Sequence, residues 1–403
     1  MPDVPSNGNL YARMDGQWRK IEDSILVPDA RFNDSSSGQP IFSGFGSEIN
    51  FSDQTALKDA GNLVAASGDS TVLTLNFTDC NSGIGRFGIT FNDASLFSNL
   101  NTIYYTNCGS FLFTKTSLGG NLPSCTNASF TNCGTSWFEL NDMGYSALTN
   151  LSFTGCGGNM FVVGADILDS MSSLETLNYN TCAQYGNFVF PSTTIRPTSV
   201  SFTSCGNTFS IPDSSGLSSV TTLDITNCGP SGFSVDFTNM LSGTASLRYL
   251  NLNTCGFMST VVFSSLGLNT VQYLAIVNTG STFTLTRSVD LENITSMLFM
   301  GCGIGGFVIQ DVRGFAGPNK TISIGSCGFT GSGFQIQDTT NLLPESDALR
   351  LLTAVYDGHN GTFSGSGVDV IELLVDGTST LQAIKASLEQ DRGFVVNLQT
   401  PTP

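Results

Sequence analysis

The stretch LSSVTTLDITNC, residues 217–228, sets a pattern that recurs along most of the chain. Leu223 and Ile225 alternate with polar residues, and Cys228 follows three residues after Ile225. This alternation predicts a short β-strand with one buried face. The same apolar-x-apolar-x-x-Cys pattern precedes ten cysteines: Cys80, Cys108, Cys133, Cys156, Cys182, Cys205, Cys228, Cys255, Cys302 and Cys327. Thr279 takes the cysteine position of one further repeat, and successive repeats are 23 to 28 residues apart.

One short strand per repeat cannot bury its apolar face alone. Repeats that stack with their strands parallel build one continuous sheet and one continuous core. The expected fold class is therefore mainly β, a parallel β-solenoid of about 11–13 coils. A Gly-rich turn and a second apolar segment follow most of the cysteines, as in GFSVDF at residues 232–237 and GFVIQDV at residues 306–312. These segments predict extended chain on the opposite side of each coil.

The quoted stretch also matches the pattern L-x-x-L-x-L-x-x-C, with Val220, Leu223, Ile225 and Cys228 in the fixed positions. It resembles the leucine-rich repeat in its cysteine variant, over about residues 62–330. The resemblance implies a right-handed solenoid. A plain β-helix is the alternative architecture, and the two differ mainly in curvature.

Three regions are expected along the chain. Residues 1–45 are an N-terminal attachment hairpin and linker, residues 46–377 are the solenoid, and residues 378–403 are a C-terminal cap and tail. Towards the end the repeat becomes irregular, and two degenerate coils are predicted at residues 352–355 and 371–375.

A short helix is expected inside the C-terminal cap. Leu381, Ile384 and Leu388 are spaced for one face of such a helix. The last coil of a solenoid exposes its core unless something covers it. We therefore expect this helix to cover the C-terminal end of the stack.

The segment YARMDGQW does not belong to the repeat. Asp15 and Gly16 supply a tight turn, and Tyr11, Arg13 and Trp18 lie on its flanks, so a β-hairpin is predicted. The motif Y-x-R-x-D-G-x-W resembles N-terminal segments in structural proteins of tailed phages, especially marine and cyanobacterial phages. The resemblance implies that these five residues attach the protein to a virion. A simple β cap on the solenoid is the plainer interpretation.

Charge restricts the partners. The chain has 403 residues and a net charge of −17, so a nucleic acid or an anionic membrane is disfavoured. No basic segment followed by an apolar run stands at the N-terminus, so no signal peptide and no membrane insertion are expected. Synthesis in a host cytoplasm and a final place in the virion are the expected localisation.

The cysteines are expected to be structural. Ten of the eleven occupy one repeated position, which favours a column of reduced, buried thiols over disulfides. Cys125 lies outside the column and is predicted to be exposed. With no C-x-x-C pair and a single histidine, His359, neither a metal site nor a cofactor is expected.

The outward residues of each strand form a second surface. Most are Ser, Thr or Asn, and the face becomes more apolar after residue 249. Hydroxyl and amide groups beside tyrosines suit carbohydrate. The ligand-binding residues predicted on this face are Tyr104, Asn178, Asp224, Tyr249, Asn251 and Tyr273. A solvated face with mutually satisfied side chains, a protein contact and an ice-binding array are the alternatives.

Catalysis is not expected, because Asp224 is the one clear outward acid and glycoside hydrolysis needs two carboxylates.

The expected function is a phage tail-fibre or tail-associated protein that binds the host surface through the solenoid. A capsid or tail decoration protein with only virion partners is one alternative, and a cellular leucine-rich-repeat adhesin is another. The expected partners are other virion proteins through the N-terminus, a host glycan or protein, and further copies of the chain, a trimer being one option.

Overall fold

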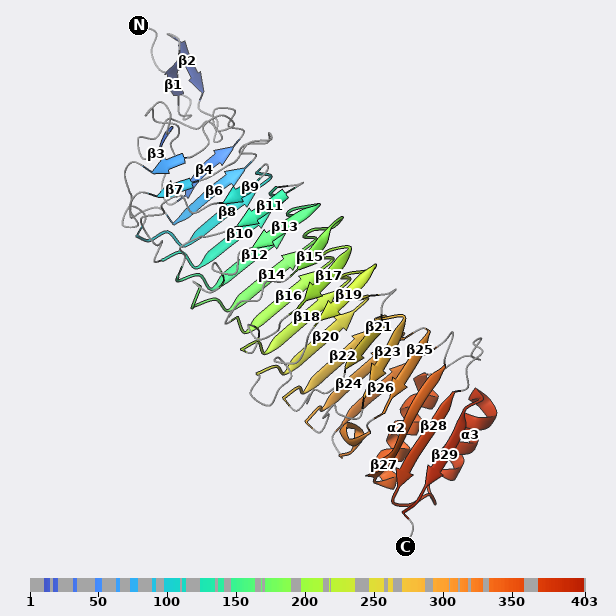
Figure 1. Cartoon of the computed structure of the whole chain (residues 1–403). Helices are drawn as coiled ribbons and strands as arrows, with labels where there is room; N and C mark the ends of the chain where they lie inside the picture. Colours follow the sequence, from blue (N-terminus) through green and yellow to red (C-terminus); the bar gives the residue numbers. More distant parts are fainter. Residues whose placement is uncertain are drawn as a thin grey trace.

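The computed structural model describes five short strands before residue 73 and most of residues 73–401. Its gaps within that range are residues 79–88, 92–97, 109–110, 114–123, 135–136, 141–145, 164–167, 169–170, 190–196, 213–216, 218, 236–245, 257–259, 264–269, 287–292, 304, 311, 318–319, 329–332 and 359–368. The chain forms one elongated stack of coils, as predicted, with its N- and C-termini at opposite ends (Figure 1).

The front sheet is the longest element of the stack. It contains 12 parallel strands, one from each coil, in the order in which they follow along the chain (Figure 1). These are β4 (Glu48–Ser52), β6 (Thr74–Thr78), β8 (Thr102–Thr106), β10 (Asn127–Thr131), β12 (Asn150–Thr154), β14 (Thr176–Asn180), β16 (Ser199–Thr203), β18 (Thr222–Thr226), β20 (Tyr249–Asn253), β22 (Tyr273–Val277), β24 (Ser296–Met300) and β26 (Thr321–Gly325). The twelve strands agree with the number of coils expected from the repeat.

The opposite side of the coils is also built from strands. One back sheet contains β9 (Phe111–Phe113), β11 (Trp137–Leu140), β13 (Met160–Val163), β15 (Asn187–Val189), β17 (Thr208–Ile211) and β19 (Gly232–Val235). A second contains β21 (Thr260–Phe263), β23 (Thr282–Leu285), β25 (Gly306–Ile309), β27 (Phe334–Leu343), β28 (Val370–Val375) and β29 (Val395–Gln399). The front sheet runs past the point where the back sheet divides.

The N-terminal strands form two smaller sheets. β1 (Tyr11–Met14) and β2 (Gln17–Lys20) pair antiparallel as the predicted hairpin. β3 (Phe32–Asp34) pairs antiparallel with β5 (Leu63–Ala65), which pairs parallel with β7 (Ile89–Phe91). A strand from within residues 1–45 therefore joins strands of the solenoid.

Aromatic side chains fill the first half of the core. One column runs up the inner face of the front sheet, with ring centroids 4.8–5.2 Å apart, through Phe77, Tyr105, Phe130, Phe153, Tyr179 and Phe202. A second column, with centroids 5.1–5.7 Å apart, comes from the back strands at Phe138, Phe161, Phe188, Phe209 and Phe233. Rings of the two columns meet edge to face, the geometry that aromatic pairs prefer.

The residue before the cysteine adopts a left-handed conformation, and in three coils it is Asn. Asn107, Asn132 and Asn227 precede Cys108, Cys133 and Cys228, and their φ angles are 53°, 52° and 56°. Asn adopts this left-handed conformation more readily than other non-glycine residues. The strand ends there and the chain turns inward, which places the next side chain, the cysteine, in the core.

The cysteine column is held by hydrogen bonds as well as by packing. The nine column cysteines among the described residues are buried and form no disulfides with one another, and Cys80 lies outside those residues. The Sγ of Cys228 lies 3.5 Å from the carbonyl oxygen of Phe202 in the preceding coil. Thr279 uses the same position in the same way, because its Oγ1 lies 3.1 Å from the carbonyl oxygen of Leu252 and accepts a hydrogen bond from the backbone N–H of Cys255. A buried donor is therefore what this position needs.

The prediction that Cys125 is exposed is wrong. Its side chain is 0% exposed, and its Sγ lies 3.6 Å from the carbonyl oxygen of Asn127. Cys125 stands two residues before strand β10, where the chain enters the sheet, so its side chain lies in the core although it is outside the column.

The stack changes character at its C-terminal end. After β26, helix α2 (Glu345–Gly358) and helix α3 (Gln382–Arg392) alternate with β27, β28 and β29. Helix α3 confirms the predicted short helix but begins at Gln382, so that Leu381 is its N-cap. The degenerate coil predicted at residues 352–355 is wrong, because these residues belong to α2. Its buried residues Ala348, Leu351, Leu352 and Val355 follow the 3.6-residue period of a helix that packs on the core.

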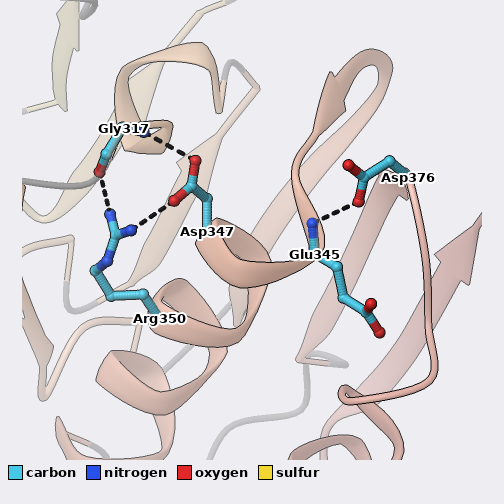
Figure 2. Close-up of polar contacts among 5 residues, drawn as sticks. All are labelled: Gly317, Glu345, Asp347, Arg350 and Asp376. Carbon is cyan, nitrogen blue, oxygen red and sulfur yellow. Dashed lines mark hydrogen bonds and ion pairs between the residues drawn. The ribbon is translucent and has the colours of Figure 1, made fainter.

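Two sets of polar contacts fix the start of α2 (Figure 2). Asp347 accepts a hydrogen bond from the backbone N–H of Gly317 at 2.8 Å and pairs with Arg350 at 2.5 Å, while Arg350 donates to the carbonyl of Gly317. The backbone N–H of Glu345 donates to Asp376 at 2.5 Å. Together these contacts tie the helix to the turn before β26 and to the end of β28.

The other end of α2 leaves no room for a side chain. A Cβ added to Gly358 would lie 1.5 Å from the carbonyl oxygen of Ile324 and 2.9 Å from the Cα of Gly325. The helix backbone therefore rests directly on β26, the last strand of the front sheet. This contact covers the edge where a thirteenth front strand would otherwise pair.

The last strand of the back sheet is covered differently. β29 is an edge strand, and its backbone could pair with another chain. Lys385 and Glu389 of α3 form an ion pair at 2.5 Å. Lys385 also donates to the carbonyl of Val396, and Glu389 accepts from the N–H of Val396 at 3.4 Å. We name these two residues the edge pair, because they satisfy backbone groups of the edge strand.

Removing the edge pair is expected to cause self-association. Replacing Lys385 and Glu389 together by Ala frees the backbone groups of Val396 for pairing with a second copy. The double variant should sediment as larger species than the wild type in velocity ultracentrifugation, increasingly so at higher concentration. Glu389→Gln keeps an oxygen acceptor and should sediment like the wild type. A double variant indistinguishable from the wild type contradicts this role.

Candidate functional site: the front face

Three rows of outward side chains run along the front face. Each front strand contributes its first, third and fifth residues, and parallel pairing in register aligns them from coil to coil. The first row includes Thr222, Tyr249 and Tyr273, and the middle row includes Asp224 and Asn251. Neighbouring residues in a row are about 4.8 Å apart. The rows therefore present a regular surface on which a few unusual residues stand out.

The N-terminal part of the face satisfies its own hydrogen bonds. Asn127 donates to Asn101 at 3.1 Å, and Asn150 donates to Asn127 at 2.8 Å. These contacts link three consecutive coils through side-chain amides. This part of the face therefore agrees with the alternative of a solvated surface whose residues satisfy one another.

A different arrangement surrounds Asp224. Its Oδ1 accepts a hydrogen bond from the Thr226 hydroxyl at 2.9 Å and from the Asn251 amide at 3.0 Å. Thr226 lies two residues along the same strand, and Asn251 is the in-register neighbour on β20. Two donors fix the carboxylate, and Oδ2 has no hydrogen bond to the described residues. One oxygen of a rigid carboxylate is thus left for a ligand.

Two tyrosines stand beside this carboxylate. The rings of Tyr249 and Tyr273 are parallel, with an interplanar angle of 0° and centroids 4.5 Å apart. Both side chains are half-buried. Partial burial raises the pKa of Tyr249, and the nearby Tyr273 and Asp224 raise it further. The phenol of Tyr249 therefore lies within the electrostatic field of Asp224.

The face becomes apolar beyond the tyrosines. Ala275, Leu298, Val277 and Met300 occupy the middle and third rows of β22 and β24. Met300 is 37% exposed and Ala275 is buried. The tyrosine pair thus marks the boundary between a polar region that carries a carboxylate and an apolar region.

The structure brings together only part of the predicted ligand-binding set. Asp224, Tyr249, Asn251 and Tyr273 form one cluster on three adjacent strands. Asn178 is on β14 and Tyr104 is on β8, two and five strands from Asp224 in the sheet order. Tyr104 is 46% exposed and lies about 24 Å from Asp224 at the usual strand spacing. These two residues do not belong to the cluster.

Two residues that adjoin the cluster are not among the predicted site residues. Thr226 fixes the carboxylate, and Thr222 is the small residue beside the ring of Tyr249 in the first row. The spacing of two residues along one strand identifies both as neighbours of Asp224 on the same face. That alternation was already visible in the stretch LSSVTTLDITNC.

The backbones of β1 and β2 pair with each other in the hairpin. Arg13 pairs with Trp18, and Tyr11 pairs with Lys20. Asp15 and Gly16, the predicted turn residues, lie outside the described residues.

The front face offers hydrogen-bonding and stacking groups to a ligand. The row neighbours of Asp224 are Ser201 and Asn251, so no second carboxylate lies beside it in the middle row. Among the described residues, no cluster of His, Cys, Asp or Glu could hold a metal ion. No helix in the described part of the chain is both long and apolar enough to cross a membrane. The chain matches no family model, no curated protein and no solved structure.

Proposed function

We propose that the protein is a tail-fibre or tail-associated protein of a phage virion and binds the host cell surface through the front face. The observation that carries the binding role is the cluster of Asp224, Asn251, Tyr249 and Tyr273. Its parallel rings and fixed carboxylate interrupt a face whose N-terminal part is occupied by amide ladders. An array of satisfied side chains explains the ladders but gives no reason for this cluster.

The virion role is supported by the hairpin of β1 and β2. It carries the motif that resembles phage structural proteins, and it stands at one end of the stack, away from the C-terminal helices (Figure 1). We propose that the hairpin attaches the protein to the particle and leaves the front face turned towards the host. We also propose that the coils are of the leucine-rich-repeat type.

Weak contacts are sufficient for this function. Several copies on one particle raise the effective concentration of each further binding site, so avidity exceeds the affinity of a single site. An exposed sheet face suits such reversible contact. The host ligand is a surface glycan or a surface protein.

A two-sided binding assay tests the proposal. The full-length chain and a version that lacks residues 1–24 are each mixed with virions stripped of fibres and with bacterial envelopes. This truncation removes β1 and β2 but keeps β3, which pairs with β5. Both proteins are expected to bind envelopes, and only the full-length protein is expected to bind virions.

Other outcomes point to other functions. Binding to virions without binding to envelopes would replace the proposal with a decoration protein that has only virion partners. Binding to envelopes without binding to virions would favour a cellular adhesin. Replacing both Tyr249 and Tyr273 by Ala is expected to reduce envelope binding at least tenfold while leaving virion binding unchanged. Intact envelope binding by that variant would move the binding site away from the cluster.

A further inference from the structure

The cluster contains a ledge with a defined shape. Tyr249 stacks on Tyr273 through one ring face, so its other face is turned along the first row towards Thr222. Thr222 is much smaller than a tyrosine and leaves that ring face uncovered by its row neighbour. We use the term ledge for the space bounded by the outer ring face of Tyr249, the side chain of Thr222 and the carboxylate of Asp224.

The spacing of Thr222 and Asp224 sets the length of the ledge. Asp224 lies two residues from Thr222 on β18, about 6.6 Å along the strand. A pyranose that stacks on the ring of Tyr249 would lie above Thr222, with a substituent directed at Asp224. Beyond Thr222 the first row continues with Ser199, also a small residue, so the ledge is open in that direction.

The charge of the ledge favours a cation over a neutral group. The carboxylate of Asp224 is held by Thr226 and Asn251, and no described Lys or Arg forms an ion pair with it. Arg248, next to Tyr249 in the sequence, directs its guanidinium to the carbonyl of Thr270 at 2.9 Å. A net charge of −17 adds a long-range attraction for cations. The face of a tyrosine ring also attracts an ammonium group.

We propose that the ledge binds a saccharide that carries an ammonium group, with the sugar ring stacked on Tyr249 and the ammonium group paired with Oδ2 of Asp224. This assignment rests on the proposed function, because it names the chemistry of the host ligand at the same face. It also predicts that anionic saccharides are rejected, since a carboxylate or sulfate would meet Asp224.

Two trisaccharides with the same β-1,4-linked backbone, one with free amino groups and one with acetylated amino groups, test the assignment. The β-1,4 trisaccharide of glucosamine carries ammonium groups at pH 5.5, and the corresponding trisaccharide of N-acetylglucosamine is neutral. Calorimetric titration of the full-length protein at low salt should give a Kd at least tenfold lower for the glucosamine trisaccharide. Higher ionic strength should reduce this difference, because salt screens the exposed charge pair.

Matched variants separate the ledge from the general charge of the protein. Asp224→Asn keeps an oxygen acceptor for Thr226 and Asn251 and should bring the two Kd values within threefold of each other. Glu175→Gln removes the same charge from an exposed residue outside the front strands and should keep the tenfold preference. Tyr249→Leu should weaken the binding of both trisaccharides. Thermal melts confirm that each variant is folded.

The result is decisive in either direction. Equal affinity of the wild type for the two trisaccharides, no binding of either at 10 mM, or a preference that survives Asp224→Asn would each overturn the assignment. If envelope binding persists in that case, the proposed function stands and only the ligand chemistry is wrong. If the glucosamine trisaccharide binds but envelopes do not, the saccharide site is supported and the proposed binding to the host surface is wrong.

Discussion

Replacing Cys205 with Asp is expected to lower the free energy of unfolding by about 4 kcal/mol at pH 7. Cys205 is 0% exposed, and its Sγ lies 3.5 Å from the carbonyl oxygen of Tyr179 and 3.4 Å from that of Thr203. A carboxylate at this position would meet two carbonyl oxygens, so the Asp must be protonated to remain buried. Keeping a group with an ordinary pKa near 3.9 protonated at pH 7 accounts for the expected cost.

The pH dependence distinguishes this mechanism from a simple packing defect. At pH 4 the same substitution should cost less than about 1 kcal/mol, because an unfolded Asp is then already half protonated. Urea unfolding followed by circular dichroism at the two pH values measures the change. A loss of equal size at pH 4 and pH 7 would show that shape, and not charge, makes the variant unstable.

Cys205→Thr is the matched control for this experiment. Thr279 occupies the equivalent position, where its Oγ1 lies 2.8 Å from the carbonyl oxygen of Val277 and 3.1 Å from that of Leu252. A hydroxyl at position 205 has the same kind of partners available. The variant should therefore remain within about 1.5 kcal/mol of the wild type at both pH values.

The front sheet could be predicted from the sequence because each coil repeats one local arrangement. Alternation at Leu223 and Ile225 gives the strand, Asn227 gives the left-handed turn, and Cys228 returns to the core. Coils of 23 to 28 residues then stack in register, so a single motif determines 11 of the 12 front strands, all except β4. Little long-range information is needed for such a fold, since each coil contacts mainly its neighbours.

Helix α2 at the C-terminal end was not predicted, although the sequence contains a signal for its start. Pro344 precedes Glu345 and Asp347, a combination that is typical of a helix start. Leu352 and Val355 are three residues apart, which is a helical spacing and not the two-residue spacing of a strand. The direct contact of Gly358 with β26 could not be predicted, because it depends on how two elements far apart in the sequence dock.

The candidate site was predicted as residues but not as an arrangement. Asp224, Tyr249 and Tyr273 were identified from the outward positions of their strands. Their grouping depends on register between coils of unequal length, and the stacking of the rings and the hydrogen bonds to Asp224 depend on side-chain geometry. Tyr104 also occupies an outward position, but it lies five strands from Asp224. An outward position within the repeat does not specify the distance along the stack.

Alkaline pH is expected to unfold the protein through its buried thiols. Burial raises the pKa of Cys125 and of Cys255 to about 12, whereas an unfolded cysteine has a pKa of about 8.5. Burial also raises the pKa of Cys133, Cys182 and Cys327. The stabilisation from each thiol is fully present below pH 8.5 and is lost as the pH rises towards the folded pKa.

The size of the effect follows from the two thiols whose pKa is about 12. At pH 10.5 an unfolded thiol is about two pH units above its pKa, so each of these cysteines costs about 2.7 kcal/mol of stability relative to pH 7. The two together remove about 5 kcal/mol, which is the whole stability of many domains. The other buried thiols with raised pKa act in the same direction. Urea unfolding between pH 7 and pH 10.5, with a reducing agent present, measures the loss.

A single substitution isolates the contribution of one thiol from other alkaline effects. Cys255→Thr introduces the residue that already stands at position 279 and does not titrate in this range. Deprotonation of Lys and Tyr elsewhere affects both proteins equally. The stability difference between wild type and variant should therefore shift by about 2.7 kcal/mol in favour of the variant between pH 7 and pH 10.5. Parallel pH curves for the two proteins would mean that Cys255 ionises in the folded state, and thus that water reaches the cysteine column.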